Sequence, residues 1–244
     1  MHALPKNGLA LLNANNLYVQ KLLKKTKKNV LLYGTTTTRK KMKVSIIAKN
    51  VQVEKNGITF TVGFNSKFFR LHTPLLGGHH VENILPAIYL ANYLGMKQTD
   101  IIHAVQSLTP LQKTMKKFTT QDGVILIDDS FNASPESVVA AATYLTTYSH
   151  KKIFVLMPLI ELGKRGKEYH YHIGEVLANN DYLFLTNKNF YKDIQEGIQR
   201  KNGKCKVYVM TPEKISQRIT EIAKKGDVVL FEGKEAGNAL TKLL

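Results

Sequence analysis

Two adjacent carboxylates end an apolar run in the middle of the chain and stand before a polar loop. The segment 126–137 reads LIDDSFNASPES. Asp128 and Asp129 follow a run that predicts a buried strand, and Asn132 stands in the loop after them. A carboxylate at the end of a strand can accept hydrogen bonds from ribose hydroxyl groups. The alternatives are that one carboxylate only caps the helix predicted from about Pro135, and that Asn132 only forms a turn.

A second polar loop combines one carboxylate with two basic side chains between glycines. The segment 160–166 reads IELGKRG and carries Glu161, Lys164 and Arg165, a setting that suits contact with anionic groups. The alternative is a solvated loop without a ligand. A third polar segment, EGKEAG at 232–237, follows the last apolar run and is also expected to be a loop.

The elements that must position these loops alternate regularly from about residue 124. Short apolar and β-branched runs predict strands, and the stretches 136–148, 168–179, 190–200 and 212–224 have helical periodicity. Strict alternation of strand and helix predicts a doubly wound, mostly parallel sheet with helices on both faces. Because ligands bind at the carboxyl ends of the strands in such a sheet, we expect the three loops to meet at one edge.

The first part of the chain predicts a different α/β arrangement. The runs GLALLN and NVLLYG predict strands around a helix near 15–25, and a later Asn-Gly dipeptide predicts a hairpin turn. Two helices are expected in HHVENILPAIYLANYLG and TDIIHAVQSL. Pro110 and a basic run interrupt the periodicity, so we place one domain at 1–108 and a second at 109–244.

The composition is that of a globular protein with a surplus of basic residues. Apolar residues make up 43%, and 35 Lys and Arg against 18 Asp and Glu give a net charge of +17, which attracts polyanions. Basic clusters at 24–28, 39–43 and 113–117 are the best support for a nucleic-acid-binding protein. These clusters lack interleaved aromatic residues, and the sequence has no helix-turn-helix or zinc pattern, so we expect solvated lysines and no nucleic-acid partner.

The sequence also bears on compartment and metal binding. No apolar stretch reaches the roughly 20 residues that cross a bilayer, and the single Cys205 predicts a core thiol, so we expect a cytoplasmic protein without a membrane partner. His170 and His172 stand two apart on a predicted helix, and His79 and His80 are adjacent. Neither pair can chelate one ion as an i, i+4 pair does, so we expect no metal site made by this chain alone.

Several short motifs, taken together, resemble the C-terminal part of the Mur ligase family. They are GGHHVENILPA, IDDSFNASPES, VLMPLIELG before a His-bearing helix, and GDVVLFEGKEAG, while ALPKNGLALLNANN resembles a late stretch of that family's central domain. The likeness extends in order and spacing over nearly the whole chain. It is strongest to the members that add D-alanyl-D-alanine to a UDP-N-acetylmuramoyl tripeptide. It implies a partial central ATP-binding domain followed by a Rossmann-like domain.

The resemblance implies an ATP-dependent ligase that forms an amide bond in peptidoglycan precursors. ATP phosphorylates a carboxylate of the UDP-muramoyl peptide to an acyl phosphate, the amine of D-Ala-D-Ala or an amino acid attacks it, and phosphate leaves. Mg²⁺ spreads the charge of this reaction. ATP and Mg²⁺ are therefore the implied cofactors.

The resemblance also implies contacts with the nucleotide. Asn83 matches the second Asn of the family's His-Asn-x-x-Asn stretch, implied to contact the adenine, and His79 matches its His, while His80 replaces the first Asn. Asp129 matches an acidic residue implied to meet the ribose. Lys113 stands where the family has Gly-Arg after the boundary proline, so a phosphate contact would fall to a lysine without the guanidinium fork.

Two groups of residues are implied to lie near the substrates. The loop near the incoming dipeptide and the nucleotide is matched by Asn132, Ser134 and Pro135. The acceptor-peptide site is matched by Glu161, Lys164 and Arg165. We expect Asn83, Asp129 and Asn132 to line a common pocket.

The family's phosphate-binding loop has no counterpart in the sequence. Such a loop needs Gly-x-x-x-x-Gly-Lys-Ser/Thr, whereas YGTTTTRKK at 33–41 has a single glycine. We expect the family's P-loop, metal ligands, modified lysine and UDP-binding domain to precede Met1. The chain would then be inactive alone, and a separate N-terminal Mur fragment is a candidate partner. The alternative is a noncatalytic Mur-like scaffold that kept the fold and lost the site.

Overall fold

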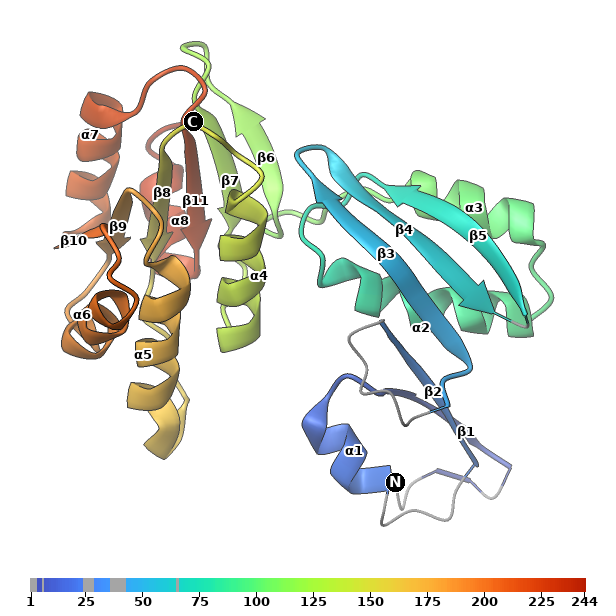
Figure 1. The fold of residues 1–244 in the computed structure, drawn as a ribbon. Coiled ribbons are helices and arrows are strands. Elements are labelled where there is room, and N and C mark those ends of the chain that lie inside the picture. The colour runs from blue at the N-terminus through green and yellow to red at the C-terminus, as the bar shows by residue number, and fades with distance from the viewer. Residues whose placement is uncertain (1–3, 6, 24–28, 36–42, 65) are drawn as a thin grey trace. The chain divides into compact units, whose positions relative to one another are not determined.

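The chain divides into two compact units, Met1–Thr109 and Pro110–Leu244, which are described separately (Figure 1). The computed structural model describes residues 4–5, 7–23, 29–35, 43–64 and 66–244. Within these ranges, no helix is both long enough and apolar enough to cross a membrane. The basic cluster at 24–28 and most of the cluster at 39–43 lie outside the described residues.

The first unit contains one mixed sheet with the strand order β1-β2-β3-β4-β5. Its strands are β1 (Leu9–Asn13), β2 (Asn29–Thr35), β3 (Ile46–Glu54), β4 (Gly57–Phe64) and β5 (Lys67–Thr73). The first three run parallel, whereas β3, β4 and β5 form an antiparallel meander through the predicted Asn-Gly turn. β5 was not predicted from the sequence. Most side chains of this edge strand are exposed and several are polar, so its apolar pattern is weak.

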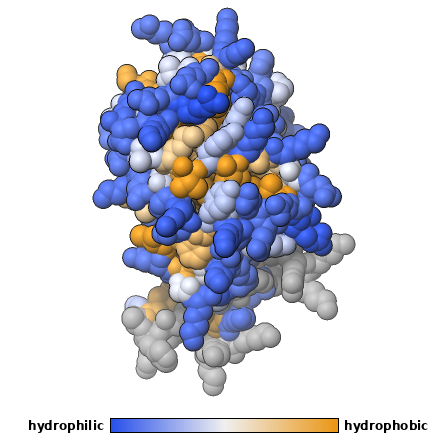
Figure 2. Space-filling view, turned by 90° about the vertical axis from the view of Figure 1, so that its left-hand side faces the viewer, coloured by the Kyte–Doolittle hydropathy of each residue, from blue (hydrophilic) through white to orange (hydrophobic). Residues whose placement is uncertain are grey.

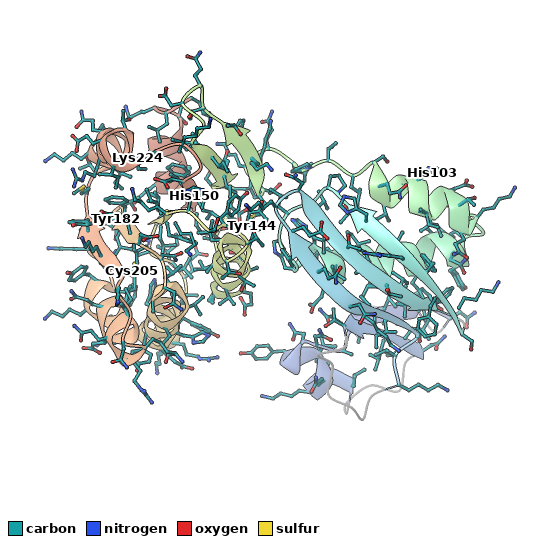
Figure 3. The ribbon with its side chains drawn as sticks, turned by 45° about the horizontal axis from the view of Figure 1, so that its top comes forward. His103, Tyr144, His150, Tyr182, Cys205 and Lys224 are labelled. Carbon is teal, nitrogen blue, oxygen red and sulfur yellow. The ribbon has the colours of Figure 1, made fainter. Side chains whose placement is uncertain are left out.

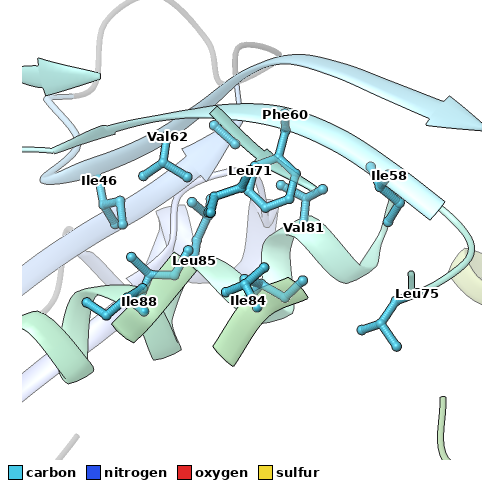
Figure 4. Close-up of a cluster of buried hydrophobic side chains, with 13 residues drawn as sticks. Ile46, Ile58, Phe60, Val62, Leu71, Leu75, Val81, Ile84, Leu85 and Ile88 are labelled. Carbon is cyan, nitrogen blue, oxygen red and sulfur yellow. The ribbon is translucent and has the colours of Figure 1, made fainter. Parts of the chain in front are cut away.

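Two helices cover one face of this sheet and form its core. The helices of this unit are α1 (Leu17–Leu23), α2 (His80–Tyr93) and α3 (Gln98–Gln106). The spacing i, i+3, i+4, i+7 places four apolar residues of α2 on one buried face: Val81, Ile84, Leu85 and Ile88. They pack against Ile58, Phe60, Val62 and Leu71 of the sheet (Figure 4). This packing fixes α2, which carries Asn83, one of the predicted nucleotide contacts.

The second unit contains a doubly wound sheet with the strand order β10-β9-β8-β11-β7-β6. Its strands are β6 (Lys116–Thr119), β7 (Ile125–Asp129), β8 (Lys152–Leu156), β9 (Tyr182–Leu185), β10 (Lys206–Val209) and β11 (Val228–Glu232). All neighbours are parallel except β6, which pairs antiparallel with β7. The predicted fold class is confirmed. The edge strand β6 was missed because its lysines hide the apolar pattern.

Helices cover both faces of the second sheet (Figure 1). They are α4 (Pro135–Leu145), α5 (Gly166–Leu177), α6 (Tyr191–Arg200), α7 (Pro212–Ile222) and α8 (Lys234–Leu240), with a 3-10 turn η1 (Gly163–Arg165) before α5. α7 and α8 share an apolar core with one face, and α4, α5 and α6 lie on the other. The expectation of a loop at 232–237 was wrong, because β11 ends at Glu232 and α8 begins two residues later, leaving Gly233 as the connection.

One face of the molecule is largely hydrophilic, and the single thiol is partly buried. The face shown in Figure 2 carries mainly hydrophilic side chains, as expected for a chain with 35 Lys and Arg. Cys205 lies directly before β10 (Figure 3), and burial, with the nearby charge of Asp181, raises its pKa to about 12. A thiol in this state is a poor nucleophile.

Candidate functional site

Three carboxylates lie at the carboxyl ends of two neighbouring strands of the second unit. This carboxylate cluster consists of Asp128 and Asp129 at the end of β7 and Glu232 at the end of β11. Asp129 and Glu232 are register partners in the parallel pair, so their side chains lie on the same side of the sheet. Glu232 is fully buried, and both aspartates are at least nine-tenths buried.

Asp128 is bound to the turn that follows its own strand. Its Oδ1 accepts hydrogen bonds from Ser130 N at 3.2 Å and Ser130 Oγ at 2.5 Å. The cap of α4 is Ser134, whose Oγ accepts from Ser137 N while Ser137 Oγ accepts from Ser134 N. The interpretation that an aspartate caps α4 was therefore wrong, because Ser134 is closer in sequence to the first turn. Pro135 follows as the first helical residue.

Asp129 joins the segment before β6 to the end of β7. Its Oδ1 accepts a hydrogen bond from Met115 N at 3.1 Å, and Lys113 O accepts one from Phe131 N at 3.0 Å. Lys113 and Met115 both have left-handed backbone conformations, with φ of 60° and 48°. Such conformations cost energy for residues other than glycine and are often found at functional sites.

Burial is the main influence on the acidity of Asp129. It raises the pKa of this carboxyl, and the charge of Asp128 acts in the same direction. Hydrogen bonds from Glu232 and Met115 act in the opposite direction. The predicted ribose contact thus has one oxygen engaged by the backbone and a second carboxyl beside it.

Glu232 is the part of the cluster that sequence reasoning missed. Its Oε1 accepts a hydrogen bond from Ser137 Oγ at 2.6 Å, whereas Oε2 is buried without a donor from the described residues. Burial, and then the charge of Asp129, raises the pKa of Glu232 well above its ordinary range. The available signal was a carboxylate at the end of VVLFE, just as Asp129 ends ILIDD.

The predicted substrate loop Glu161–Arg165 is exposed and polar. Glu161 has φ of 63°, and Lys164 and Arg165 lie in η1. Arg165 donates to both carboxylate oxygens of Glu168 and lies over the ring of Tyr169 at 4.5 Å. The guanidinium is therefore already paired with Glu168 of α5. The position of this loop agrees equally with a ligand contact and with the solvated alternative.

A buried histidine holds this loop to α5. His170 Nε2 accepts a hydrogen bond from Leu159 N at 2.9 Å, and Nδ1 lies 2.7 Å from Gly166 O. Because a carbonyl oxygen can only accept, Nδ1 carries the proton and the ring is neutral. The ring stacks on Phe190 at 4.0 Å, and burial lowers its pKa. His170 is thus a structural residue, and His172 pairs with Glu175 on the exposed side of the helix.

Asn83 lines an apolar cavity in the first unit. The cavity has a volume of about 390 Å³ and lies along α2 and α3. Asn83 and His80 contribute polar groups, and the rest of the lining is mostly apolar, with Ile84, Ile88 and Ile101 among it. A mostly apolar cavity with a few polar groups is typical of small-molecule sites. The contact of Asn83 with an adenine stays a prediction.

Polar groups at the first turn of α2 join this helix to the sheet. Glu82 accepts hydrogen bonds from Asn13 Nδ2 at 2.6 Å and Asn15 Nδ2 at 2.7 Å, both just after or at the end of β1. No role was predicted for Glu82 from the sequence. His79 precedes α2, and its Nδ1 is buried without a partner from the described residues; burial lowers its pKa.

The described residues do not fit a magnesium site. Within them, no three or more His, Cys, Asp or Glu side chains are grouped to hold a metal ion. In the carboxylate cluster, Asp128 is bound to Ser130 and Asp129 to Met115. No step is therefore assigned here to Mg²⁺.

The other predicted site residues divide between the two units. Asn132 is exposed after β7, and its Oδ1 accepts a hydrogen bond from Ala133 N at 3.0 Å, which agrees with a turn former. Asn83 belongs to the first unit, and Asp129 and Asn132 belong to the second. Their common pocket stays a prediction.

The second unit is a Rossmann-like α/β domain with its polar residues where such sheets bind ligands. Two protein-family models match most of the chain. The model of the Mur ligase middle domain matches residues 1–91, and that of the Mur ligase glutamate ligase domain matches residues 115–235. The chain belongs to the Mur ligase family.

Curated relatives agree with this assignment. The chain is 30% identical over 190 residues to a UDP-N-acetylmuramoyl-tripeptide--D-alanyl-D-alanine ligase of Bacillus subtilis. This alignment covers 75% of this chain and 41% of the relative. The chain is 25% identical over 243 residues to a UDP-N-acetylmuramate--L-alanine ligase of Clostridium kluyveri, covering 94% and 51%. The chain thus spans 41% and 51% of the length of these two relatives.

Solved structures share the fold over nearly the whole chain. MurF from Acinetobacter baumannii has a TM-score of 0.82 at 21% identity, covering 99% of this chain and 52% of that one. MurF ligase from Thermotoga maritima, crystallised in complex with ADP, has a TM-score of 0.77 at 23% identity, covering 97% and 53%.

Proposed function

We propose that this chain is the nucleotide-clamping and acceptor part of an ATP-dependent ligase of peptidoglycan precursor synthesis. The ligase joins D-Ala-D-Ala or an amino acid to a UDP-muramoyl peptide through an acyl phosphate. The observation that carries this proposal is the match of two Mur ligase domains, in order, to one chain. The polar edge of the second sheet and the apolar cavity beside Asn83 add chemical support.

Both units carry residues that are proposed to contact the nucleotide. The adenine enters the apolar cavity along α2, and Asn83 donates to or accepts from its edge. Asp129 accepts hydrogen bonds from the ribose hydroxyls, since a carboxylate has lone pairs beyond the one that Met115 N occupies. Lys113, which lies in a loop with left-handed backbone conformations, supplies positive charge to a phosphate group of the nucleotide.

The substrate contacts are proposed at the loops after β7 and β8. Asn132, Ser134 and Pro135 precede or open α4, and the incoming dipeptide would lie beside them. Glu161, Lys164 and Arg165 would face the UDP-muramoyl peptide, and these side chains are exposed. The groups that hold the transferring phosphate would come from an N-terminal Mur segment, either as a separate fragment or as part of a longer chain. We place the reaction in the cytoplasm.

Nucleotide binding gives the direct test. ATP binding to this chain is measured by saturation-transfer NMR and calorimetry, with Asn83→Ala as the test variant and Asn92→Ala as the control on the same helix but outside the cavity lining. We expect Asn83→Ala to weaken binding by about tenfold, the loss of one hydrogen bond at a buried base. The control should bind as the wild type does.

The same experiment separates the alternatives. A Mur-like scaffold that has lost the site would not bind ATP, and this result would overturn the proposal. A nucleic-acid-binding protein would instead retain duplex DNA with an affinity that falls steeply as salt rises. We expect this chain to retain no more duplex DNA than a basic protein of equal charge does.

A further inference from the structure

Asp129 and Glu232 form a pair of buried carboxyl groups on adjacent strands. They are register partners of β7 and β11, and neighbouring strands lie about 4.8 Å apart. Asp129 is 8% exposed and Glu232 is 0% exposed. Two ionised carboxylates so close together and so deeply buried would repel each other without solvent screening. One proton must therefore be shared between them.

The hydrogen-bond donors around the pair decide which residue carries the proton. Asp129 Oδ1 accepts from the backbone N–H of Met115, a donor that stabilises an ionised oxygen. Glu232 receives only Ser137 Oγ on Oε1, and its Oε2 has no donor from the described residues. A buried oxygen without a donor is costly when ionised, but a protonated one can itself donate.

We propose that Glu232 is a positioning residue, a neutral carboxylic acid whose Oε2–H donates to Asp129 and holds that carboxylate ionised and oriented at the ligand-binding edge. The direction of the pKa shift of Glu232 agrees, since burial and the charge of Asp129 both raise it. The proposal that Asp129 then receives a ligand rests on the proposed nucleotide-binding function. The proposal of a shared proton does not depend on that function.

The charged groups on the surrounding elements do not remove the need for this proton. The negative charge of Asp128 on β7 also raises the pKa of Asp129. The neighbouring helices and the segment before β6 carry Glu136 on α4, Lys234 and Glu235 on α8, and Lys113. Among the described residues, none of these four forms an ion pair or a side-chain hydrogen bond with Asp129 or Glu232. Glu235 is engaged by Thr186 and Asn187.

The protonation state is tested by titrating the carboxyl carbons with ¹³C NMR in the intact chain. We expect Glu232 to keep its neutral-carboxyl signal at a pH above the ordinary glutamate range, and to ionise only at a still higher pH. A Glu232 signal that already has the carboxylate form just above the ordinary glutamate pKa would overturn the proposal. Glu232→Gln assigns the signal and keeps a donor at the same position.

Stability as a function of pH provides a second readout. A group with a raised pKa in the folded state stabilises the protein fully below its unfolded pKa, and this stabilisation is lost as pH rises through the folded pKa. The unfolding free energy of the wild type should therefore fall relative to Glu232→Gln as pH rises above the ordinary glutamate range. A constant difference between the two proteins would count against a shared proton.

ATP affinity tests the positioning role. Glu232→Gln should bind within about twofold of the wild type, because its amide can donate to Asp129, whereas Glu232→Met should bind about tenfold more weakly, as expected for one lost hydrogen bond to a charged group. Equal ATP binding by Glu232→Gln and Glu232→Met would overturn the positioning role of Glu232.

If the wild type binds no ATP, the proposed function fails. The NMR titration would still show whether Asp129 and Glu232 share a proton. Glu196→Gln is the matched surface control.

Discussion

The backbone N–H of Met115 donates a hydrogen bond to Asp129 Oδ1 over 3.1 Å. This contact connects the segment before β6 with the carboxyl end of β7. Asp129 therefore acts within the fold as well as at the proposed ribose site. Its two roles can be separated because Asn keeps an acceptor at Oδ1 but loses the charge.

Asp129→Asn and Asp129→Ala should differ in stability and in their effect on Glu232. Alanine leaves Met115 N without its acceptor and should lower the unfolding free energy by about 1–3 kcal/mol. Asparagine keeps that bond and can donate to Glu232 from Nδ2, so the pKa of Glu232 should fall relative to the wild type. Chemical denaturation and ¹³C NMR measure the two effects. An unchanged Glu232 titration in Asp129→Asn would contradict the account.

His170→Ala should weaken the loop before α5. The change leaves Leu159 N without its acceptor and removes the ring that stacks on Phe190, so the unfolding free energy should fall by at least about 1–3 kcal/mol. Chemical denaturation at pH 7.5 measures this loss. His172→Ala, on the exposed side of α5, is the control and should change stability little.

The stability that His170 contributes should also depend on pH. Burial lowers the pKa of His170, so the unfolded state binds more protons as pH falls through the ordinary histidine range. The stabilisation is therefore lost as pH falls, and the difference between the wild type and His170→Ala should narrow from pH 7.5 to pH 5.5. A difference that widens over this interval would show that the buried ring is not neutral.

Ser134→Ala should destabilise α4 through the loss of its cap. The side chain of Ser134 accepts from Ser137 N, and removing such a cap typically costs about 1 kcal/mol. Thermal or chemical denaturation measures the change. Thr211→Ala is the matched control, because Thr211 stands at the start of α7 but its side chain caps no backbone N–H. Equal losses in both variants would contradict the assigned cap.

Gly174→Ala should separate α5 from α6. A Cβ on Gly174 would collide with the backbone oxygen of Ile194, which cannot move as a flexible side chain does. Overpacking of this kind typically costs about 1–3 kcal/mol, so the unfolding free energy should fall by at least that amount. Gln199→Ala, on the exposed side of α6, is the control and should leave the unfolding free energy nearly unchanged. A stable Gly174→Ala protein would contradict the close approach of the two helices.

The fold was more accessible to sequence reasoning than the site. Alternating apolar runs and helical periods predicted the doubly wound sheet because each element buries a characteristic face. The edge strands β5 and β6 escaped because lysines and other polar residues mask their apolar pattern. The start of α8 at Lys234 was read as loop because glycine and charged residues dominate EGKEAG.

Burial and long-range pairing explain what was missed in the site. Asp129 stood out beside Asp128 after an apolar run, whereas Glu232 became informative only when β11 was known to lie next to β7. Strand order is set by tertiary packing, and the spacing of residues within one segment does not reveal it. The same holds for Glu82, whose partners Asn13 and Asn15 lie 69 and 67 residues away along the chain.

The most direct test of the central claim is a ligase assay with the missing half supplied. This chain is combined with the N-terminal portion of a Mur ligase that carries a P-loop, and complex formation is verified by size-exclusion chromatography. Phosphate release is then measured with ATP, Mg²⁺, UDP-muramoyl tripeptide and D-Ala-D-Ala. The account predicts release that requires both substrates and falls in Asn83→Ala. A verified complex that releases no phosphate would contradict it.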